Sequence, residues 1–208
     1  MRLRFAKSGD LRLVSHHDLM RCLERLIRRS ALPVAQSQGF NPRPKVVFAL
    51  ALALGIEGRR EVVELELAEP LEPSEVLERL RAAAPPGLEF FEAEAAPTGR
   101  AARPTAAQYR LELPADRRAA AAEAAAAFLA SPRWPHVRHR PDRAPAEVDL
   151  RPFVLDAALA ADGALGLRLA VDPGGSARPE EVLDALGLRD LLAAGAILAR
   201  TELELAPT

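Results

Sequence analysis

Apolar and polar residues in the first 96 positions of the chain follow two different periods. Alternation with a period of two, typical of strands, occurs at residues 2–5, 63–67 and 88–94, and less clearly at 11–14. Residues 47–54 are all apolar, and from Phe48 to Leu54 large side chains alternate with alanine, which also predicts a strand. Helical spacing occurs from Ser15 to a point before Pro33, and again at residues 74–84. The resulting order, β-α-β-β-α-β, predicts a ferredoxin-like half.

The second half of the chain has a similar alternation of periods. Residues 97–106 contain Pro97, Gly99 and Pro104 and are interpreted as a linker. The strand candidates that follow it are 109–113, 137–140, 147–159, 165–171 and 197–205, and the helix candidates are 115–130 and 179–186. We therefore expect an α+β protein with two ferredoxin-like (βαββαβ) halves in tandem, at residues 1–96 and 107–208. Each half would have an antiparallel sheet with helices packed on one face.

The two halves contain similar helix sequences. Residues 73–80 and 179–186 match at five of eight positions, which indicates an internal duplication. A proline at the first helical position followed by acidic residues is also common at helix starts, so the match has an ordinary alternative explanation.

The composition is that of a folded chain with segregated charge. Apolar residues make up 49% of it, which is enough to bury a core. Of 28 basic and 29 acidic residues, the first 60 positions hold twelve basic and only four acidic ones. This basic front favours a polyanion or an acidic protein as partner. There is no signal-like apolar N-terminus and no apolar run long enough for a membrane helix, so we expect a cytoplasmic protein without membrane contact.

Polar side chains cluster at the start of the first helix, where Ser15 and Asp18 are expected to cap it. The positive end of the helix dipole would keep His16 and His17 neutral, so that one imidazole could act as a base or hydrogen-bond donor. The alternative is purely structural, with His16 packed against the sheet.

Residues 36–45 follow neither period and are stiffened by Pro42 and Pro44. This loop could bind single-stranded RNA, because it combines amides, an aromatic ring and cations beside the helix residues Arg21, Arg25 and Arg28. The alternative is a structural turn in which Phe40 is buried. The groups that the loop offers are Gln36, Gln38, Phe40, Asn41, Arg43 and Lys45.

Candidate chemistry elsewhere is sparse. Asp149 and Arg151 are predicted to share one face of a strand, as a salt bridge or as a second site. His136 and His139 have metal-like spacing only on a helix, which the neighbouring prolines disfavour. With a single cysteine, Cys22, the chain can form neither an internal disulfide nor an iron–sulfur site of its own. We therefore expect no metal and no cofactor in this chain.

Several motifs resemble one known family. They are the segments 7–12 (Lys-Ser-Gly-Asp-Leu-Arg), 15–21 (Ser-His-His-Asp-Leu-Met-Arg), 37–45 (Ser-Gln-Gly-Phe-Asn-Pro-Arg-Pro-Lys), 149–152 and 177–179. The chain is similar in these segments to a radical-SAM-linked domain of unknown function, which occurs beside or fused to cobalamin-binding radical SAM proteins. The resemblance implies a radical SAM enzyme as partner. His17 departs from the apolar residue usual in that family, so no role is carried onto it.

These observations predict an accessory protein that binds RNA and presents it to a radical SAM enzyme. One alternative is a metal-independent endoribonuclease with His16 as general acid or base. Another is a protein–protein adaptor without RNA. The predicted binding residues are Ser15, His16, Asp18, Arg21, Arg25, Gln38, Phe40, Asn41, Arg43 and Lys45, with Asp149 and Arg151 as candidates in the second half.

Overall fold

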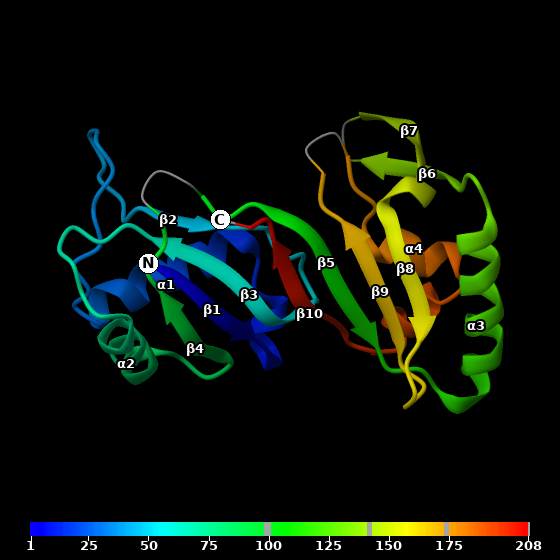
Figure 1. Cartoon of the computed structure of the whole chain (residues 1–208), viewed down its shortest axis with the longest axis horizontal. Coiled ribbons are helices and arrows are strands. Elements are labelled where there is room, and N and C mark those ends of the chain that lie inside the picture. Colours follow the sequence, from blue (N-terminus) through cyan, green and yellow to red (C-terminus); the bar gives the residue numbers. More distant parts are fainter. Residues whose placement is uncertain (98–100, 141–142, 173–174, 208) are drawn as a thin grey trace. The chain divides into compact units, whose positions relative to one another are not determined.

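The computed structural model describes residues 1–97, 101–140, 143–172 and 175–207 (Figure 1). The chain divides into two compact units, one of residues 1–104 with 205–208 and one of residues 105–204. Both combine helices with a mainly antiparallel sheet, so the predicted α+β class is confirmed. The assignment of both halves as ferredoxin-like stays a prediction.

The first unit is a sheet covered by two helices. Its strands are β1 (Arg2–Lys7), β2 (Val46–Phe48), β3 (Glu57–Leu65) and β4 (Leu88–Glu94). Its helices are α1 (His16–Arg29) and α2 (Pro73–Ala83), with a 3-10 helix η1 (Gly9–Leu13). The order β4-β1-β3 is extended by β2, which pairs with β3, and all three pairings are antiparallel.

Both helices of the first unit cover the same face of the sheet. Leu3 and Phe5 of β1 lie in one core with Leu23 and Leu26 of α1 and Leu80 of α2. Successive strand residues point to opposite faces, so the arginines between these apolar positions lie on the other face. The apolar stripes that the sequence shows thus decide which face the helices cover.

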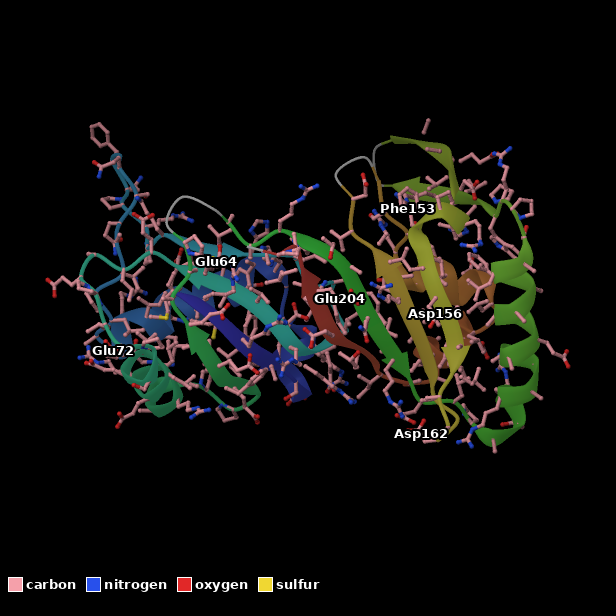
Figure 2. The ribbon with its side chains drawn as sticks, in the orientation of Figure 1. Glu64, Glu72, Phe153, Asp156, Asp162 and Glu204 are labelled. Carbon is pink, nitrogen blue, oxygen red and sulfur yellow. The ribbon has the colours of Figure 1, made fainter. Side chains whose placement is uncertain are left out.

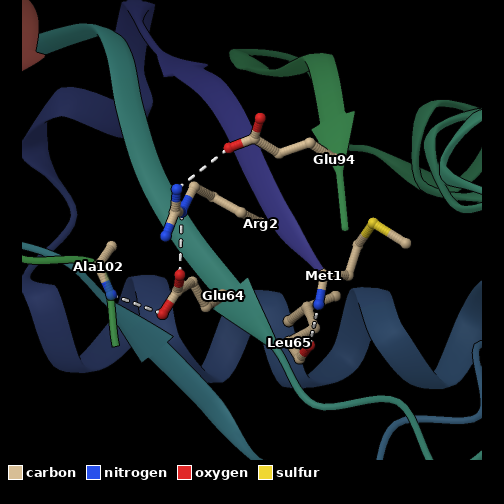
Figure 3. A network of polar contacts seen from close by, with 6 residues as sticks. All are labelled: Met1, Arg2, Glu64, Leu65, Glu94 and Ala102. Atoms are coloured by element: carbon tan, nitrogen blue, oxygen red, sulfur yellow. Dashed lines mark hydrogen bonds and ion pairs between the residues drawn. The ribbon is translucent and has the colours of Figure 1, made fainter. Parts of the chain in front are cut away.

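The other face of this sheet carries a polar network (Figure 3). Arg2, only 8% exposed, donates to Glu64 of β3 at 3.0 Å and to Glu94 of β4 at 3.2 Å. Glu64 also accepts a hydrogen bond from the backbone of Ala102 at 2.8 Å. These contacts join β1, β3 and the edge strand β4, and they hold Ala102, just beyond residues 98–100, which lie outside the described part.

Two predicted strands of the first unit are wrong in form or length. Residues 11–14 lie mainly in η1, because Leu11 and Val14, three residues apart, face the core together from a 3-10 turn. The strand expected at 47–54 ends at Phe48, and Leu54 is 64% exposed. An apolar run without polar alternation does not mark where a strand ends.

The second unit contains more elements than predicted. They are β5 (Pro104–Leu111), α3 (Ala115–Ala130), β6 (Pro135–Arg140), β7 (Arg143–Asp149), η2 (Arg151–Phe153), β8 (Val154–Leu159), β9 (Leu165–Ala170), α4 (Pro179–Ala185), α5 (Arg189–Ala193) and β10 (Leu198–Leu205). The strand order is β10-β5-β9-β8, while β6 and β7 form a separate two-stranded sheet. The extended segment expected at 147–159 is interrupted by η2, and α5 was not predicted. β5 already begins at Pro104, inside the predicted linker.

A cross-strand cluster holds this second sheet together. Glu204 of β10, labelled in Figure 2, accepts hydrogen bonds from Arg168 of β9 at 2.7 Å and from Gln108 of β5 at 2.9 Å. The Arg168 guanidinium, followed by the Gln108 amide, lowers the pKa of Glu204 to about 2. The carboxylate is therefore ionised at neutral pH and joins three strands.

Each unit inserts a two-stranded segment between its first helix and the next strand of its main sheet. In the first unit this is the first ribbon, residues 35–45, where Gln36 bridges to Pro44 and Ser37 N donates to Arg43 O at 2.8 Å. In the second unit it is the second ribbon, β6 with β7. The shared insertion point supports the predicted duplication more strongly than the helix sequences do.

Candidate functional site

The first ribbon is held at its stem by the backbone. Lys45 N donates to Ala35 O at 2.8 Å, and both Ala35 and Lys45 bond to the backbone of Glu66. The side chain of Lys45 also pairs with Glu66 at 2.7 Å. Beyond this stem the ribbon projects from the first unit (Figure 1). Its end is therefore presented to solvent by a fixed base.

Phe40 lies at the turn of the first ribbon and is fully exposed, at 105% of its reference area. The preceding Gly39 has a φ of 134°, a conformation that side-chain-bearing residues rarely adopt. The reading in which Phe40 is buried in a structural turn is therefore wrong.

Several guanidinium groups near the ribbon and along α1 have no partner in the described part of the chain. Arg25, Arg28 and Arg43 are exposed, and the side chain of none of them forms a hydrogen bond or an ion pair with a described residue. Arg21 differs, because it pairs with Asp18 at 3.2 Å. Gln38 and Asn41 are exposed as well, with no side-chain hydrogen bond in the described part of the chain.

The start of α1 is capped as predicted. The Ser15 hydroxyl accepts from Asp18 N at 3.2 Å and donates to the Asp18 carboxylate at 2.7 Å. The hydrogen bond from Ser15, followed by the charge of Arg21, lowers the pKa of Asp18. Ser15, Asp18 and Arg21 are thus hydrogen-bonding and ion-pair partners of one another.

His16 is half-buried against Phe48, with the two ring centroids 5.2 Å apart. Burial is the main cause that lowers its pKa, and the charges of His17 and Lys7 add to it. The imidazole is therefore neutral at pH 7, for a different main reason than the helix dipole. Its Nδ1 is buried and has no partner among the described residues, so proton exchange with a substrate could use only Nε2.

The structure does not bring the two candidate segments together. In the described part of the chain, no hydrogen bond, ion pair or ring contact joins Ser15, His16 or Asp18 to residues 36–45. His16 instead contacts Phe48, at the far end of β2 from the ribbon. The helix start therefore has no direct contact of these kinds with the first ribbon in the described part of the chain.

The second-half candidates form a backbone-binding corner. Asp149 accepts from Trp134 N at 2.7 Å and from Arg151 N at 3.1 Å, and these two hydrogen bonds lower its pKa. Its side-chain ion pair is with Arg133, at 3.4 Å, while the Arg151 guanidinium donates to two backbone carbonyls. The predicted Asp149–Arg151 salt bridge is wrong because Arg151 lies in η2 and not on a strand.

Sequence reasoning overlooked the most deeply buried cation of the first unit. Lys7 is 0% exposed, and its Nζ donates to Val14 O at 2.9 Å, which fixes η1 against β1. A signal for it was present, because Lys7 and Lys45 are the only lysines in an arginine-rich chain. A buried Arg138–Glu181 pair in the second unit was also missed.

The described residues contain neither a candidate metal site nor a candidate membrane-spanning helix. Within the described ranges, no group of histidine, cysteine, aspartate and glutamate side chains has the geometry of a metal site. Nor does any helix there have the length and apolar character needed to cross a membrane.

Comparison with known families decides the relationship of the chain. A family described as an uncharacterized protein conserved in bacteria (DUF2344) matches residues 1–179. The chain belongs to this family. That description gives no partner, so the link to radical SAM proteins stays a prediction. No curated protein matches the chain.

Two solved structures have weak similarity. A chain of the "Crystal Structure of a Cbf5-Nop10-Gar1 Complex" has a TM-score of 0.43 at 12% identity, covering 97% of this chain and 48% of that one. The chain thus spans about half of that protein's length. The "Crystal Structure of an Unknown Protein from Galdieria sulphuraria" has a TM-score of 0.29 at 14% identity, covering 99% of this chain and 97% of that one. Similarity at this level supports no conclusion about function.

Proposed function

We propose that the chain is an RNA-binding accessory protein that presents RNA to a radical SAM enzyme. The observation that carries this proposal is the fully exposed ring of Phe40 at the turn of a braced ribbon. Burying a phenylalanine contributes about 1.5–3 kcal/mol to folding, so a ring held in solvent forgoes that stabilisation. An exposed ring suits base stacking, which is worth about 1–3 kcal/mol per base.

The charges around the ribbon support an RNA backbone as the ligand. Arg43 lies on the ribbon, and Arg25 and Arg28 lie one helical turn apart on α1. Because these guanidiniums are not engaged within the described protein, they can pair with phosphates without breaking an existing contact. The excess of basic residues in the first 60 positions adds long-range attraction.

The partner follows from the family resemblance of the motifs. A radical SAM reaction needs an iron–sulfur cluster held by several cysteines, and this chain has one. The chemistry would therefore reside on the partner, while this chain holds the RNA.

Fluorescence anisotropy with a labelled single-stranded RNA tests the proposal. We expect Phe40→Ala to weaken binding by about tenfold, through lost stacking. Arg43→Ala should reduce the slope of log K against log salt by about 0.7, the value for one phosphate contact on a single strand. Leu54→Ala, which removes another exposed apolar side chain of the same unit, is the matched control and should bind normally. Absence of RNA binding at low salt, with and without the radical SAM partner, would contradict the proposal.

The adaptor function is retained as a second candidate because of a different surface. Leu13 and Leu54 are 59% and 64% exposed, and they flank the hydrogen bond between Arg12 O and Gly55 N, at 2.8 Å. Such neighbouring exposed leucines suit a protein partner. If the chain is an adaptor, the double variant Leu13→Ser with Leu54→Ser should break the complex with the partner enzyme. Charge reversal at Arg21 and Arg25 should also break this complex, and the complex should form equally well with and without RNA.

A further inference from the structure

A polar groove lies in the second unit between β6 and the segment that carries α4. Its volume is about 530 Å³, within the range of small-ligand sites. One wall is formed by residues 136–139 and the other by residues from Arg178 to Arg189. No predicted function used this part of the molecule.

The course of β6 brings two histidines to the same groove. On a regular strand His136 and His139, three residues apart, would point to opposite faces. The pairing of β6 with β7 shifts register at this point, because His139 of β6 opposes two residues of β7, Ala144 and Pro145. A bulge of this kind bends the bulged strand and increases its local twist. Both imidazoles line the groove.

The base of the groove is rigid and electrically balanced. Arg138 and Glu181, 8% and 7% exposed, form two hydrogen bonds of 2.6 Å, and Arg138 also donates to Ser176 O at 2.7 Å. Burial raises the pKa of Glu181, but the hydrogen bonds from Arg138 and from Arg178 N lower it by more than burial raises it. The net pKa is below its usual value, so the carboxylate stays charged. This pair fixes β6 to α4 and leaves the recognition of a ligand to other side chains.

The remaining groove residues carry charges of both signs. Arg189, Glu180 and Asp184 have no side-chain partner among the described residues, and Arg178 approaches only Glu181, at 4.0 Å. A purely anionic ligand would meet two carboxylates, and a purely cationic one would meet two guanidiniums. The groove therefore suits a ligand that combines an anionic group with hydrogen-bond donors.

We propose that this groove binds one ribonucleotide, as a second contact site for the RNA. The phosphate would pair with Arg178 and Arg189, since guanidinium binds phosphate through paired hydrogen bonds. The base would stack on the imidazoles of His136 and His139, as unpaired RNA bases do on aromatic side chains. The inference rests on the proposed RNA-binding function for the identity of the ligand.

The carboxylates of Glu180 and Asp184 refine the choice of base. A carboxylate accepts hydrogen bonds from the exocyclic amino and ring N–H groups on the Watson–Crick edge of a base. Guanine offers both a ring N–H and an amino group there, whereas adenine, cytosine and uracil each offer one donor group. We therefore expect guanosine monophosphate to bind best of the four nucleoside monophosphates.

Nuclear magnetic resonance titration of the full chain tests this site. With each nucleoside 5′-monophosphate we expect backbone shifts confined to residues 136–139 and 178–189, with a Kd on the order of 1 mM. Arg189→Ala and His139→Ala, both at exposed positions, should each weaken binding by about tenfold. Arg133→Ala removes an exposed arginine outside the groove and should bind as the native chain does.

Each other outcome of the titration is decisive. Inorganic phosphate that shifts the same residues as strongly as the nucleotides would reduce the groove to an anion site and overturn the inference, as would shifts elsewhere only. If nucleotides bind here but RNA does not bind the chain, the proposed function fails and the groove stands. If RNA binding depends on Phe40 while the groove variants leave it unchanged and nucleotides do not bind, the groove fails and the function stands.

Discussion

The two ribbons enter their units at the same point of the element order but are held in opposite ways. The first ribbon is fixed only at its stem, by backbone hydrogen bonds and the exposed Lys45–Glu66 pair. The second ribbon has an anchor beyond its stem, because the buried Arg138 of β6 bonds to Glu181 of α4. One ribbon presents its turn to solvent, and the other forms the wall of a groove.

This difference shows how one inserted segment acquires two roles. A projecting ribbon can place an aromatic ring inside a ligand, but it defines no cavity. A ribbon bonded to a helix encloses space and aims its side chains inward. In both units an aromatic contact secures the neighbouring chain: His16 with Phe48 in the first, and Phe128 with Trp134, 4.8 Å apart, in the second.

Breaking the anchor of the second ribbon should have the largest effect on stability. Glu181→Leu leaves Arg138 buried without a counter-charge, so we expect the second unit to lose about 3–5 kcal/mol. Trp134, the single tryptophan, reports urea unfolding of this unit by its fluorescence. The double variant Arg138→Met with Glu181→Leu should recover most of the loss, since no charge stays buried. A loss below about 1 kcal/mol for Glu181→Leu would show that the anchor is dispensable.

Lowering the pH should destabilise the first unit through His16, by less than Glu181→Leu destabilises the second unit. Burial holds the pKa of His16 below its usual 6.5, so below pH 6.5 the unfolded chain takes up a proton more readily than the folded one. The contribution of neutral His16 to the free energy of unfolding is complete above pH 6.5, and it is lost as the pH falls toward the pKa of His16 in the folded state. His16→Asn should flatten the pH dependence of thermal unfolding in this range. An unchanged profile in His16→Asn would contradict the assignment.

Removing the exposed ring of the first ribbon should have the smallest effect on stability. Phe40→Ala deletes no buried contact, so the free energy of unfolding should stay within about 0.5 kcal/mol of the native value. Urea unfolding followed by circular dichroism measures this. A larger loss would mean that the ring packs against the protein in solution, and the contrast between the two ribbons would disappear.

Local signals in the sequence predicted much of the fold. The Ser15 cap marked the start of α1, and the run of helix formers after Pro114 gave both ends of α3 correctly. Leu3 and Phe5 identified β1 and its buried face. These predictions succeeded because capping, proline stops and apolar periodicity act between residues close in the sequence.

Predictions that depended on distant partners failed or stayed open. Residues 11–14 suited both an extended segment and a 3-10 turn, and the core that Leu11 and Val14 reach selected the turn. The sequence predicted a salt bridge between Asp149 and its neighbour Arg151, but in the fold Asp149 contacts the side chain of Arg133 and the backbone of Trp134. The choice of lysine sets Lys7 and Lys45 apart from the arginines, but it does not show which of the two is buried.

The sequence alone was enough to establish the α+β class, the basic front and the chemically equipped loop at 36–45, because composition and short-range patterns carry that information. The exposure of Phe40, the contact of His16 with Phe48 and the groove beside His136 and His139 depend on which surfaces pack together. Packing joins residues that are far apart in the sequence, as when α4 meets β6 through Arg138 and Glu181, 43 positions away. The sequence therefore identified the loop and its polar and aromatic side chains, but the role of each side chain depended on its three-dimensional neighbours.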